Sequence, residues 1–269
     1  YLHMGDLVDR VYEDREKTTE EVVTFLNKVC EKQLEPYIDA SYEELADYVN
    51  AYDQKMQMKR ENIADRGIWT AKKRYILNVW DSEGVRYEQA KLKIMGIEAI
   101  KTSTPAPCRT MLKDAFKLLM TGTEDEVIDY IEKCRSEFKN FPPEEVGFPR
   151  SVNNLQKYKG VSDIYNKGTP INVRGALLFN HYIKKNNLEH KYSAIQNGEK
   201  IRFCYLKTPN WMHENVISYI QDLPKELDLH KHVDYDLQFE KAFLEPIKVI
   251  LNCIGWETVL KNTLESFFS

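Results

Sequence analysis

The fold is decided by a stretch that reads Trp69-Thr-Ala-Lys-Lys-Arg-Tyr-Ile-Leu-Asn-Val-Trp80, followed by Asp81-Ser-Glu-Gly84 and by a basic run from Val85 to Met95. Aromatic and β-branched residues are enriched in strands, and a short polar segment that ends in Gly is typical of a hairpin turn. The stretch therefore predicts two antiparallel strands, 69–80 and 85–95, joined by a turn at 81–84.

Cations and a tyrosine recur along the first of these strands. Alternation with period two would place Lys73 and Tyr75 on one face of the strand. Lys72, Arg74 and Ile76 would lie on the other face. A lysine and a tyrosine that project together suit the binding of a nucleic acid.

The charge of the chain is unevenly distributed. The net charge is −4, yet residues 66–101 contain eight basic and four acidic residues, and residues 150–174 contain five basic and one acidic. Each window carries +4, so the remaining residues carry −12. Two local concentrations of positive charge on an acidic body favour local phosphate binding. Solvated lysine-rich strand edges remain the alternative.

Composition indicates a globular protein. The chain has 269 residues, of which 42% are hydrophobic and 12% aromatic, enough for one large or two modest domains. Because it contains no long apolar run and no secretory signal, and begins with Tyr rather than Met, we expect a cytoplasmic fragment of a longer protein. Its five cysteines are widely spaced and predict reduced packing residues. His230 and His232 are interpreted as loop residues rather than metal ligands.

Local signals predict helices in the amino-terminal part. Thr18 and Glu21 match a capping box, and the helix that they begin is expected to end before Pro36. A second helix is predicted from about Ser41, and a short strand at 56–58.

Pro105 and Pro107 mark a predicted boundary, because proline restricts the backbone and lacks a ladder donor. The pattern beyond it is mainly helical, and Pro246 is expected to bend the last helix. The elements predicted there are helices around 111–119 and 127–138, a looser section at 149–170, a helix at 176–184, a strand at 201–207 and a long helix at 237–254.

The motif Lys72-Lys73-Arg74-Tyr75 resembles the Lys-Lys-Arg-Tyr motif in the palm of family B DNA polymerases, where a Lys-x-Tyr strand touches the minor groove of the newly made duplex. Order and spacing agree with replicative polymerases of large tailed bacteriophages over almost the whole chain. Three further matching segments are Leu92-Lys-Ile-Met-Gly-Ile-Glu98, Ser103-Thr-Pro105 and Pro170-Ile-Asn-Val-Arg-Gly175.

The resemblance implies an α+β fold, with a partial palm of antiparallel sheet and helices followed by a mainly helical thumb. The implied division is the end of the palm at 1–104, the thumb at 105–260 and a clamp-binding tail at 261–269. The family's Asp-Thr-Asp-Ser motif runs into a pair that looks like Tyr1-Leu2, so the main catalytic aspartates lie outside this chain. No catalytic residue is therefore assigned within it.

The resemblance also implies which side chains contact DNA. Lys93 corresponds to a lysine near the primer end, and Asn172 stands where the family often has His. The implied DNA-binding residues are Lys72, Lys73, Arg74, Tyr75, Lys93, Asn154, Lys157, Lys167, Asn172 and Arg174.

The resemblance implies Mg²⁺ as the cofactor of the intact enzyme, with its main ligands outside this chain. Glu61 stands where phage enzymes carry an acidic residue near the metals, and an ordinary surface glutamate is the alternative. The family often has an acidic residue in place of Lys59, which is a departure from its pattern.

The tail resembles the carboxy-terminal peptide by which replicative polymerases bind a ring-shaped sliding clamp. One helical turn would group Leu264, Phe267 and Phe268 as an apolar plug. Lys261 stands where many such peptides have Gln. Aromatic residues packed into the thumb core are the alternative.

The sequence thus predicts a DNA-directed DNA polymerase fragment that grips primer-template duplex, binds a sliding clamp and pairs with the amino-terminal part of the polymerase. Its setting would be the cytoplasm of an infected bacterial host, with no membrane contact. Two alternatives remain open: a separately encoded carboxy-terminal subunit of a split polymerase, and a non-catalytic protein that binds duplex DNA.

Overall fold

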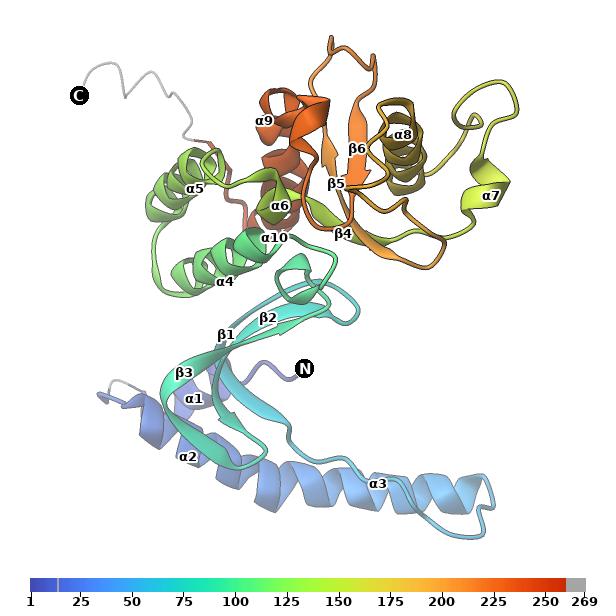
Figure 1. The fold of residues 1–269 in the computed structure, drawn as a ribbon. Coiled ribbons are helices and arrows are strands. Elements are labelled where there is room, and N and C mark those ends of the chain that lie inside the picture. Colours follow the sequence, from blue (N-terminus) through green and yellow to red (C-terminus); the bar gives the residue numbers. More distant parts are fainter. Residues whose placement is uncertain (14, 260–269) are drawn as a thin grey trace, which may run out of the picture. The chain divides into compact units, whose positions relative to one another are not determined.

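Helices and antiparallel strands are both present in the computed structural model, which describes residues 1–13 and 15–259 (Figure 1). The predicted α+β class is confirmed, with two three-stranded sheets. The chain divides into two compact units. Unit 1 comprises Tyr1–Gly67 and Ile76–Lys93, and unit 2 comprises Ile68–Tyr75 together with the described residues from Ile94 onward. The functional division at 104 and 105 stays a prediction.

The first sheet is a three-stranded meander in the order β1-β2-β3. Its strands are β1 (Asn62–Ala71), β2 (Arg74–Ser82) and β3 (Val85–Met95). The predicted turn before β3 is confirmed: Glu83 and Gly84 have φ of +52° and +88°, as a two-residue type I′ turn requires. The Gly84 amide donates to Asp81 Oδ1 at 3.0 Å, which closes the turn.

The prediction of one strand from Trp69 to Trp80 is wrong. Lys72 and Lys73 form a two-residue turn between β1 and β2, and Lys73 has a φ of +62°. The argument that Lys73 and Tyr75 share a strand face therefore fails. Two lysines are not typical hairpin-turn residues, so strand propensity concealed the turn.

The helices of unit 1 form a longer run than the sequence predicts. They are α1 (Gly5–Tyr12), α2 (Thr19–Val29), the π-helical segment η1 (Cys30–Leu34) and α3 (Glu35–Tyr48). The capping box is confirmed, with the Thr18 amide donating to Glu21 Oε2 at 2.9 Å. An end before Pro36 and a new start near Ser41 are wrong, because helical structure continues through both residues.

A widened turn explains how the run passes Pro36. The Glu35 amide bonds to the carbonyl of Cys30, five residues back rather than four. Proline lacks an amide hydrogen, and its ring crowds the carbonyl one turn before it. The π-helical segment opens that turn.

The predicted short strand at 56–58 is also wrong. Residues 53–61 have no regular secondary structure, and Met56 and Met58 are exposed at 44% and 52%. The alternation of methionines is present in the sequence, but β-structure also needs a neighbouring strand to pair with.

Buried charges connect the helices of unit 1 to its sheet. Asp81 is 2% exposed and lies between two arginines, with its oxygens 2.6 Å from Arg60 Nη1 and 3.3 Å from Arg86 Nε. The same arginines reach α2: Arg60 donates to Asn27 Oδ1 at 2.7 Å and Arg86 to Thr24 Oγ1 at 3.1 Å. This group of five side chains, the Asp81 cluster, fastens α2 to the β2–β3 turn.

Unit 2 combines helices with the second sheet, whose order is β4-β5-β6. The helices are α4 (Ala106–Thr121), α5 (Glu124–Phe138), α6 (Pro143–Val146), α7 (Leu155–Tyr158) and α8 (Ile171–Lys185), and the strands are β4 (Phe148–Ser151), β5 (Lys200–Tyr205) and β6 (Val216–Tyr219). Short 3-10 turns lie at η2 (Glu98–Ile100), η3 (Lys225–Leu227) and η4 (His230–His232). The helices predicted near 111–119, 127–138 and 176–184 and the strand near 201–207 are confirmed.

Two strands of unit 2 were not predicted. β4 contains Pro149, which argues against a strand, and it lies at an edge of the sheet, where proline is tolerated. β6 is buried at all four positions, so it lacks the alternation that marks a half-exposed strand. α8 covers β6, and a Cβ atom on Gly175 would lie 2.4 Å from Ser218 Oγ. This glycine allows the helix to approach the sheet closely.

The last helical run also contains a π-helical segment just before a proline, as the run through Pro36 does. It consists of α9 (Tyr235–Phe239), the π-helical segment η5 (Glu240–Leu244) and α10 (Glu245–Cys253). The long helix predicted at 237–254 is confirmed. The Glu245 amide bonds to the Glu240 carbonyl, just before Pro246.

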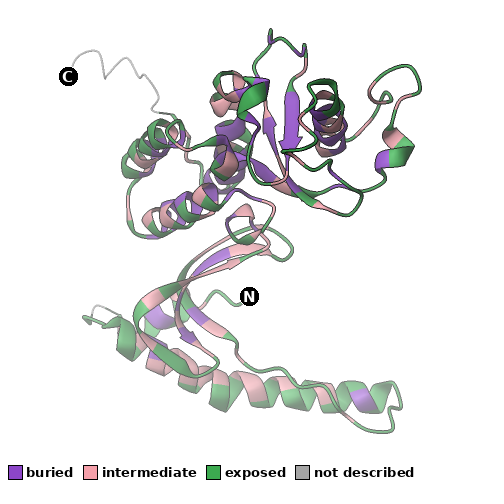
Figure 2. Ribbon diagram, viewed as in Figure 1, coloured by how far each residue is buried: buried purple, intermediate pink, exposed green. Residues whose placement is uncertain are grey.

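Burial differs between the two units (Figure 2). In unit 2, α4, α5, α8 and α10 each bury several apolar side chains. In unit 1, burial within α3, which lies wholly in the described part of the chain, is confined to Ala46. Outside residues 14 and 260–269, which the structure does not describe, no helix combines the length and apolarity needed to span a membrane.

Asp81→Asn should destabilise the protein by about 3 kcal/mol, because it leaves two arginines without their buried counter-charge. Burial favours the neutral acid, but hydrogen bonds from Arg60 and Gly84 prevail and lower the pKa of Asp81 below its ordinary value. The stabilisation is therefore complete above the unfolded-state pKa and is lost as the pH falls through the lowered folded-state pKa. Urea unfolding at several pH values measures both effects.

The control is Asp65→Asn, since the Asp65 carboxylate accepts one exposed hydrogen bond from Asn78 in the same sheet. It should change stability by less than about 0.5 kcal/mol. Equal losses in the two variants would contradict the role given to the Asp81 cluster.

Candidate nucleic-acid interface

The exposed turn at Lys72 and Lys73 presents two adjacent cations. Gly96 supports this turn from the end of β3: a Cβ atom built on Gly96 would lie 2.3 Å from the Lys73 carbonyl oxygen. Gly96 also has a φ of +68°, which favours glycine. The Thr70 hydroxyl donates to the Arg74 carbonyl at 3.3 Å across the same turn. These contacts fix the backbone and leave both lysine side chains in solvent.

Arg74 is held by an ion pair. Its Nη2 lies 3.0 Å from Glu98 Oε2, and Lys101 Nζ lies 2.8 Å from Glu98 Oε1. Burial raises the pKa of Glu98, but the hydrogen bond from Lys101 and the charge of Arg74 outweigh it and lower that pKa below its ordinary value. Arg74 thus ties residues 98–101 to the hairpin, and much of its charge is balanced within the protein.

Tyr75 packs beside Trp69, with ring centroids 6.5 Å apart and ring planes at 39°. Both rings retain partial exposure. Strand pairing of β1 with β2 brings them together, so the turn carries an aromatic pair behind its two lysines.

A second group of predicted residues lies at the beginning of α8. Asn172 Nδ2 donates to the Ser151 carbonyl at 3.0 Å, and the Asn172 carbonyl accepts from Ser218 Oγ at 2.9 Å. Asn172 thus joins the start of α8 to the end of β4 and to β6. Its side-chain amide has one structural partner already.

Arg174 is positioned by the loop between β5 and β6. Its Nη2 donates to Asn215 Oδ1, and its guanidinium lies 5.7 Å from the centre of the Tyr165 ring. The Tyr165 hydroxyl in turn donates to Glu214 Oε1 at 2.7 Å. Burial, and then the bond to Glu214, raise the pKa of Tyr165. Asn215, Glu214 and Tyr165 were not found from the sequence, because each acts through a contact with a residue distant in the chain.

The remaining predicted residues of unit 2 lie around a closed loop. Asn154 has a φ of +60° and precedes α7, while Lys157 and Lys167 are exposed. Asn166 Nδ2 donates to the carbonyls of Lys157 and Lys159, each at 3.3 Å. These bonds shape the loop, and the Lys157 ammonium lies 5.5 Å from the centre of the Tyr158 ring.

Lys93 and Glu61 belong to unit 1 and form an ion pair. The hydrogen bond from Lys93 lowers the pKa of Glu61. Within residues 1–13 and 15–259, no group of three or more His, Cys, Asp or Glu side chains could hold a metal ion. Glu61 is paired with Lys93, and its place near the metal ions of an intact polymerase stays a prediction.

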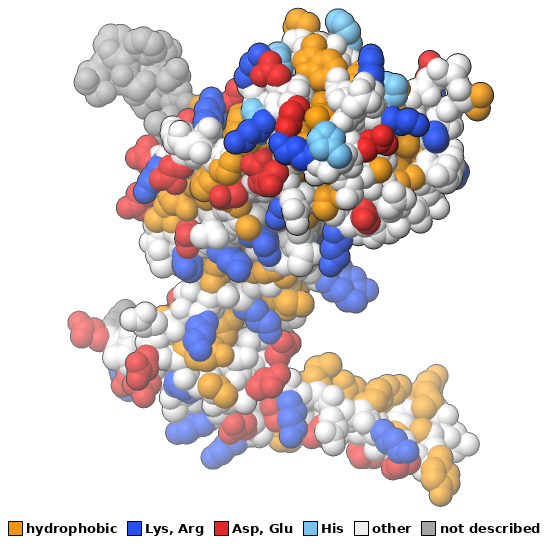
Figure 3. Space-filling model, viewed as in Figure 1, with side chains coloured by type: hydrophobic (Ala, Val, Ile, Leu, Met, Phe, Trp, Pro, Cys, Tyr) orange, Lys and Arg blue, Asp and Glu red, His pale blue; other side chains and the backbone are white. Residues whose placement is uncertain are grey.

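The surface in Figure 3 has lysine and arginine side chains interspersed with acidic ones on each unit. On that face there is no continuous basic band. Among the predicted residues described above, Lys72 and Lys73 are exposed on a turn and Arg174 is held by Asn215. Leu264, Phe267 and Phe268 lie outside the described residues, so the predicted clamp-binding tail has no place in this geometry.

No family model matches the chain. Over its whole length, however, the chain is 33% identical to the DNA-directed DNA polymerase of Escherichia phage RB69. The chain resembles part of a phage DNA polymerase. It is also 28% identical, again over its whole length, to the DNA-directed DNA polymerase of Enterobacteria phage T4. In both comparisons the chain spans 31% of the length of the relative. The resemblance to phage polymerases is thereby confirmed.

Gly96→Ala should displace the Lys72–Lys73 turn, because the new methyl group would overlap the Lys73 carbonyl. The expected cost is about 1–3 kcal/mol, as for other overpacked sites, in addition to the backbone strain of a positive φ. Thermal unfolding measures it.

Gly84→Ala is the matched control, because Gly84 also has a positive φ but has no heavy atom within 4 Å of the added carbon. Its cost should be that of backbone strain alone, about 1 kcal/mol. Equal melting temperatures for the two variants would refute the contact between Gly96 and the turn.

Proposed function

We propose that this chain is the end of the palm and the thumb of a family B DNA-directed DNA polymerase, and that it grips primer-template duplex during DNA synthesis. The observation that carries the proposal is the match of the whole chain to two phage DNA polymerases. The proposed division is palm at 1–104, thumb at 105–260 and clamp-binding tail at 261–269. The exposed lysines and the positioned Arg174 support the proposal.

Phosphate contacts would supply the grip. A polymerase accepts every base pair, so it relies on the backbone and on groove features common to all pairs rather than on base sequence. Lys73, Lys157 and Lys167 are exposed ammonium groups that suit phosphates as point charges. Arg174 presents a guanidinium whose orientation is set by Asn215. Arg74 and Asn172, which have internal partners, would act mainly by holding the interface in shape.

The intact protein would be a nucleotidyltransferase that uses Mg²⁺. Two metal ions in such an enzyme activate the primer hydroxyl and stabilise the leaving pyrophosphate. The carboxylates that hold them would come from the part of the polymerase outside this chain. Glu61 would contribute at most a nearby negative charge, offset by Lys93.

Exposed apolar residues of unit 1 favour a further partner, the amino-terminal part of the polymerase. α3 exposes Tyr37 and Tyr48 at 73% and 88%, and Tyr52 beyond its end is fully exposed. A helix that buries so little gains little stability from packing. We infer that the rest of the polymerase covers this apolar surface in the intact protein.

Lys73→Ala and Arg174→Ala should each weaken the binding of duplex oligonucleotides, by a similar factor for unrelated sequences. Each should also reduce the slope of log K against log salt by about 1, because one phosphate contact is lost. Fluorescence anisotropy over a range of salt concentrations measures both quantities.

Lys133→Ala is the control, because Lys133 is a cation of α5 in an exposed ion pair with Glu137. It should leave the salt slope unchanged. A slope that stays at the wild-type value in both Lys73→Ala and Arg174→Ala would disprove the proposed contacts.

Deletion of 264–269 should abolish binding to the sliding clamp of the same phage, because it removes Leu264, Phe267 and Phe268. The melting temperature should stay within about 1 °C of the wild type, since surface changes rarely alter stability. Surface plasmon resonance on immobilised clamp gives the affinity. A large fall in melting temperature would instead support packing of the tail against the thumb.

A further inference from the structure

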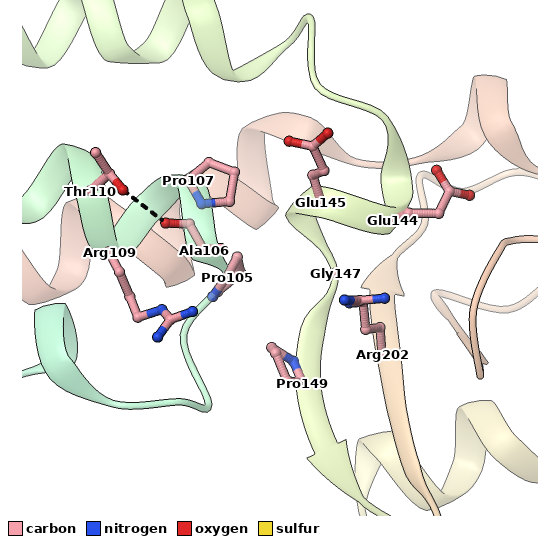
Figure 4. A pocket seen from close by; sticks show the side chains of 10 residues that line it. All are labelled: Pro105, Ala106, Pro107, Arg109, Thr110, Glu144, Glu145, Gly147, Pro149 and Arg202. Carbon is pink, nitrogen blue, oxygen red and sulfur yellow. Dashed lines mark hydrogen bonds between the residues drawn. The ribbon is translucent and has the colours of Figure 1, made fainter.

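A pocket of about 420 Å³ lies in unit 2, between the first turns of α4 and the elements α6, β4 and β5 (Figure 4). It is distinct from the residues to which duplex binding is assigned above. Two arginines line it, Arg109 from α4 and Arg202 from β5. Pro105, Pro107 and Pro149 supply apolar walls that lack amide donors. The walls are stiff, and the charge in the pocket comes from side chains.

Arg109 has an unused hydrogen-bond donor. Its Nε is buried and has no hydrogen-bond partner among the residues that the structure describes. A buried donor without an acceptor is unfavourable, because it has lost its hydrogen bonds to water, so such groups usually have a bound partner. The pocket beside Arg109 offers space for that partner.

The two glutamates that line the pocket do not balance the charges of Arg109 and Arg202. Glu144 Oε1 accepts the amide of Leu223 at 3.0 Å. In Figure 4 the carboxylates of Glu144 and Glu145 point away from the guanidinium groups of Arg109 and Arg202, which lie on opposite sides of the pocket. An anion in this pocket would therefore have a positive group on each side of it.

We propose that this pocket binds a phosphate group. Guanidinium groups match phosphate oxygens with paired, charge-assisted hydrogen bonds, and two of them from different elements would hold one anion between them. The phosphate would belong either to a free phosphate compound or to the backbone of a nucleic acid, and the second source alone rests on the proposed function.

Isothermal titration of the full chain with pyrophosphate tests the pocket. Arg109→Gln and Arg202→Gln should each weaken binding at least about tenfold, since each removes charge-assisted hydrogen bonds. Lys113→Gln is the matched control, because it removes one positive charge from an exposed position of the same helix outside the pocket. Its affinity should equal that of the wild type. Circular dichroism melting of all variants identifies any loss of fold.

Two results would overturn the proposal: no binding of pyrophosphate by the wild type, or equal weakening in folded Arg109→Gln, Arg202→Gln and Lys113→Gln. Competition then identifies the source. Displacement of pyrophosphate by a duplex oligonucleotide would assign the pocket to backbone phosphate, and binding without displacement would assign it to a free phosphate compound. A wild type that binds pyrophosphate but no duplex would refute the proposed function and leave the pocket supported.

Discussion

The arrangement of unit 1 depends on a buried carboxylate between two arginines. Asp81 stands at the β2–β3 turn, and Arg60 and Arg86 connect it to α2. Buried ion pairs contribute little net stability compared with apolar packing, but they tolerate few alternative arrangements. In a unit where α3 buries little more than Ala46, apolar contacts alone would leave the position of the helices weakly specified. The Asp81 cluster adds specific contacts between α2 and the β2–β3 turn.

Local signals were sufficient where the determinants lie within a few residues. The capping box of Thr18 and the turn at Glu83 and Gly84 are of this kind, and both were predicted. The turn at Lys72 and Lys73 was missed because its support comes from Gly96, more than twenty residues later. The helix end before Pro36 and the new start near Ser41 were misplaced for another reason. Proline predicts the end of a helix, and the sequence does not reveal that a π-helical turn will accommodate the proline.

The sequence predicted which residues of the candidate site are cations, but not which of them already have partners within the protein. The sequence identifies Lys73, Arg74 and Arg174 equally as cations, yet their surroundings differ. Lys73 extends into solvent, Arg74 is balanced by Glu98, and Arg174 is oriented by Asn215. A cation that is already paired gives up an existing interaction when it binds phosphate, so its net contribution is smaller. Long-range partners decide this difference, and no local pattern reports them.

A net charge of −4 is compatible with a grip on DNA because the number of phosphate contacts matters more than the total charge. Each contact releases condensed counterions, and this release supplies most of the sequence-independent affinity. Acidic side chains interspersed among the cations weaken the long-range attraction between the protein and DNA. Salt also screens charges that are more than about 8–10 Å apart, so direct contacts between a cation and a phosphate matter most. Under the proposed function, a protein that holds a duplex and still moves along it would benefit from a few positioned cations rather than from a continuous basic band. Lys73, held on a glycine-supported turn, and Arg174, held by an asparagine, would meet that requirement.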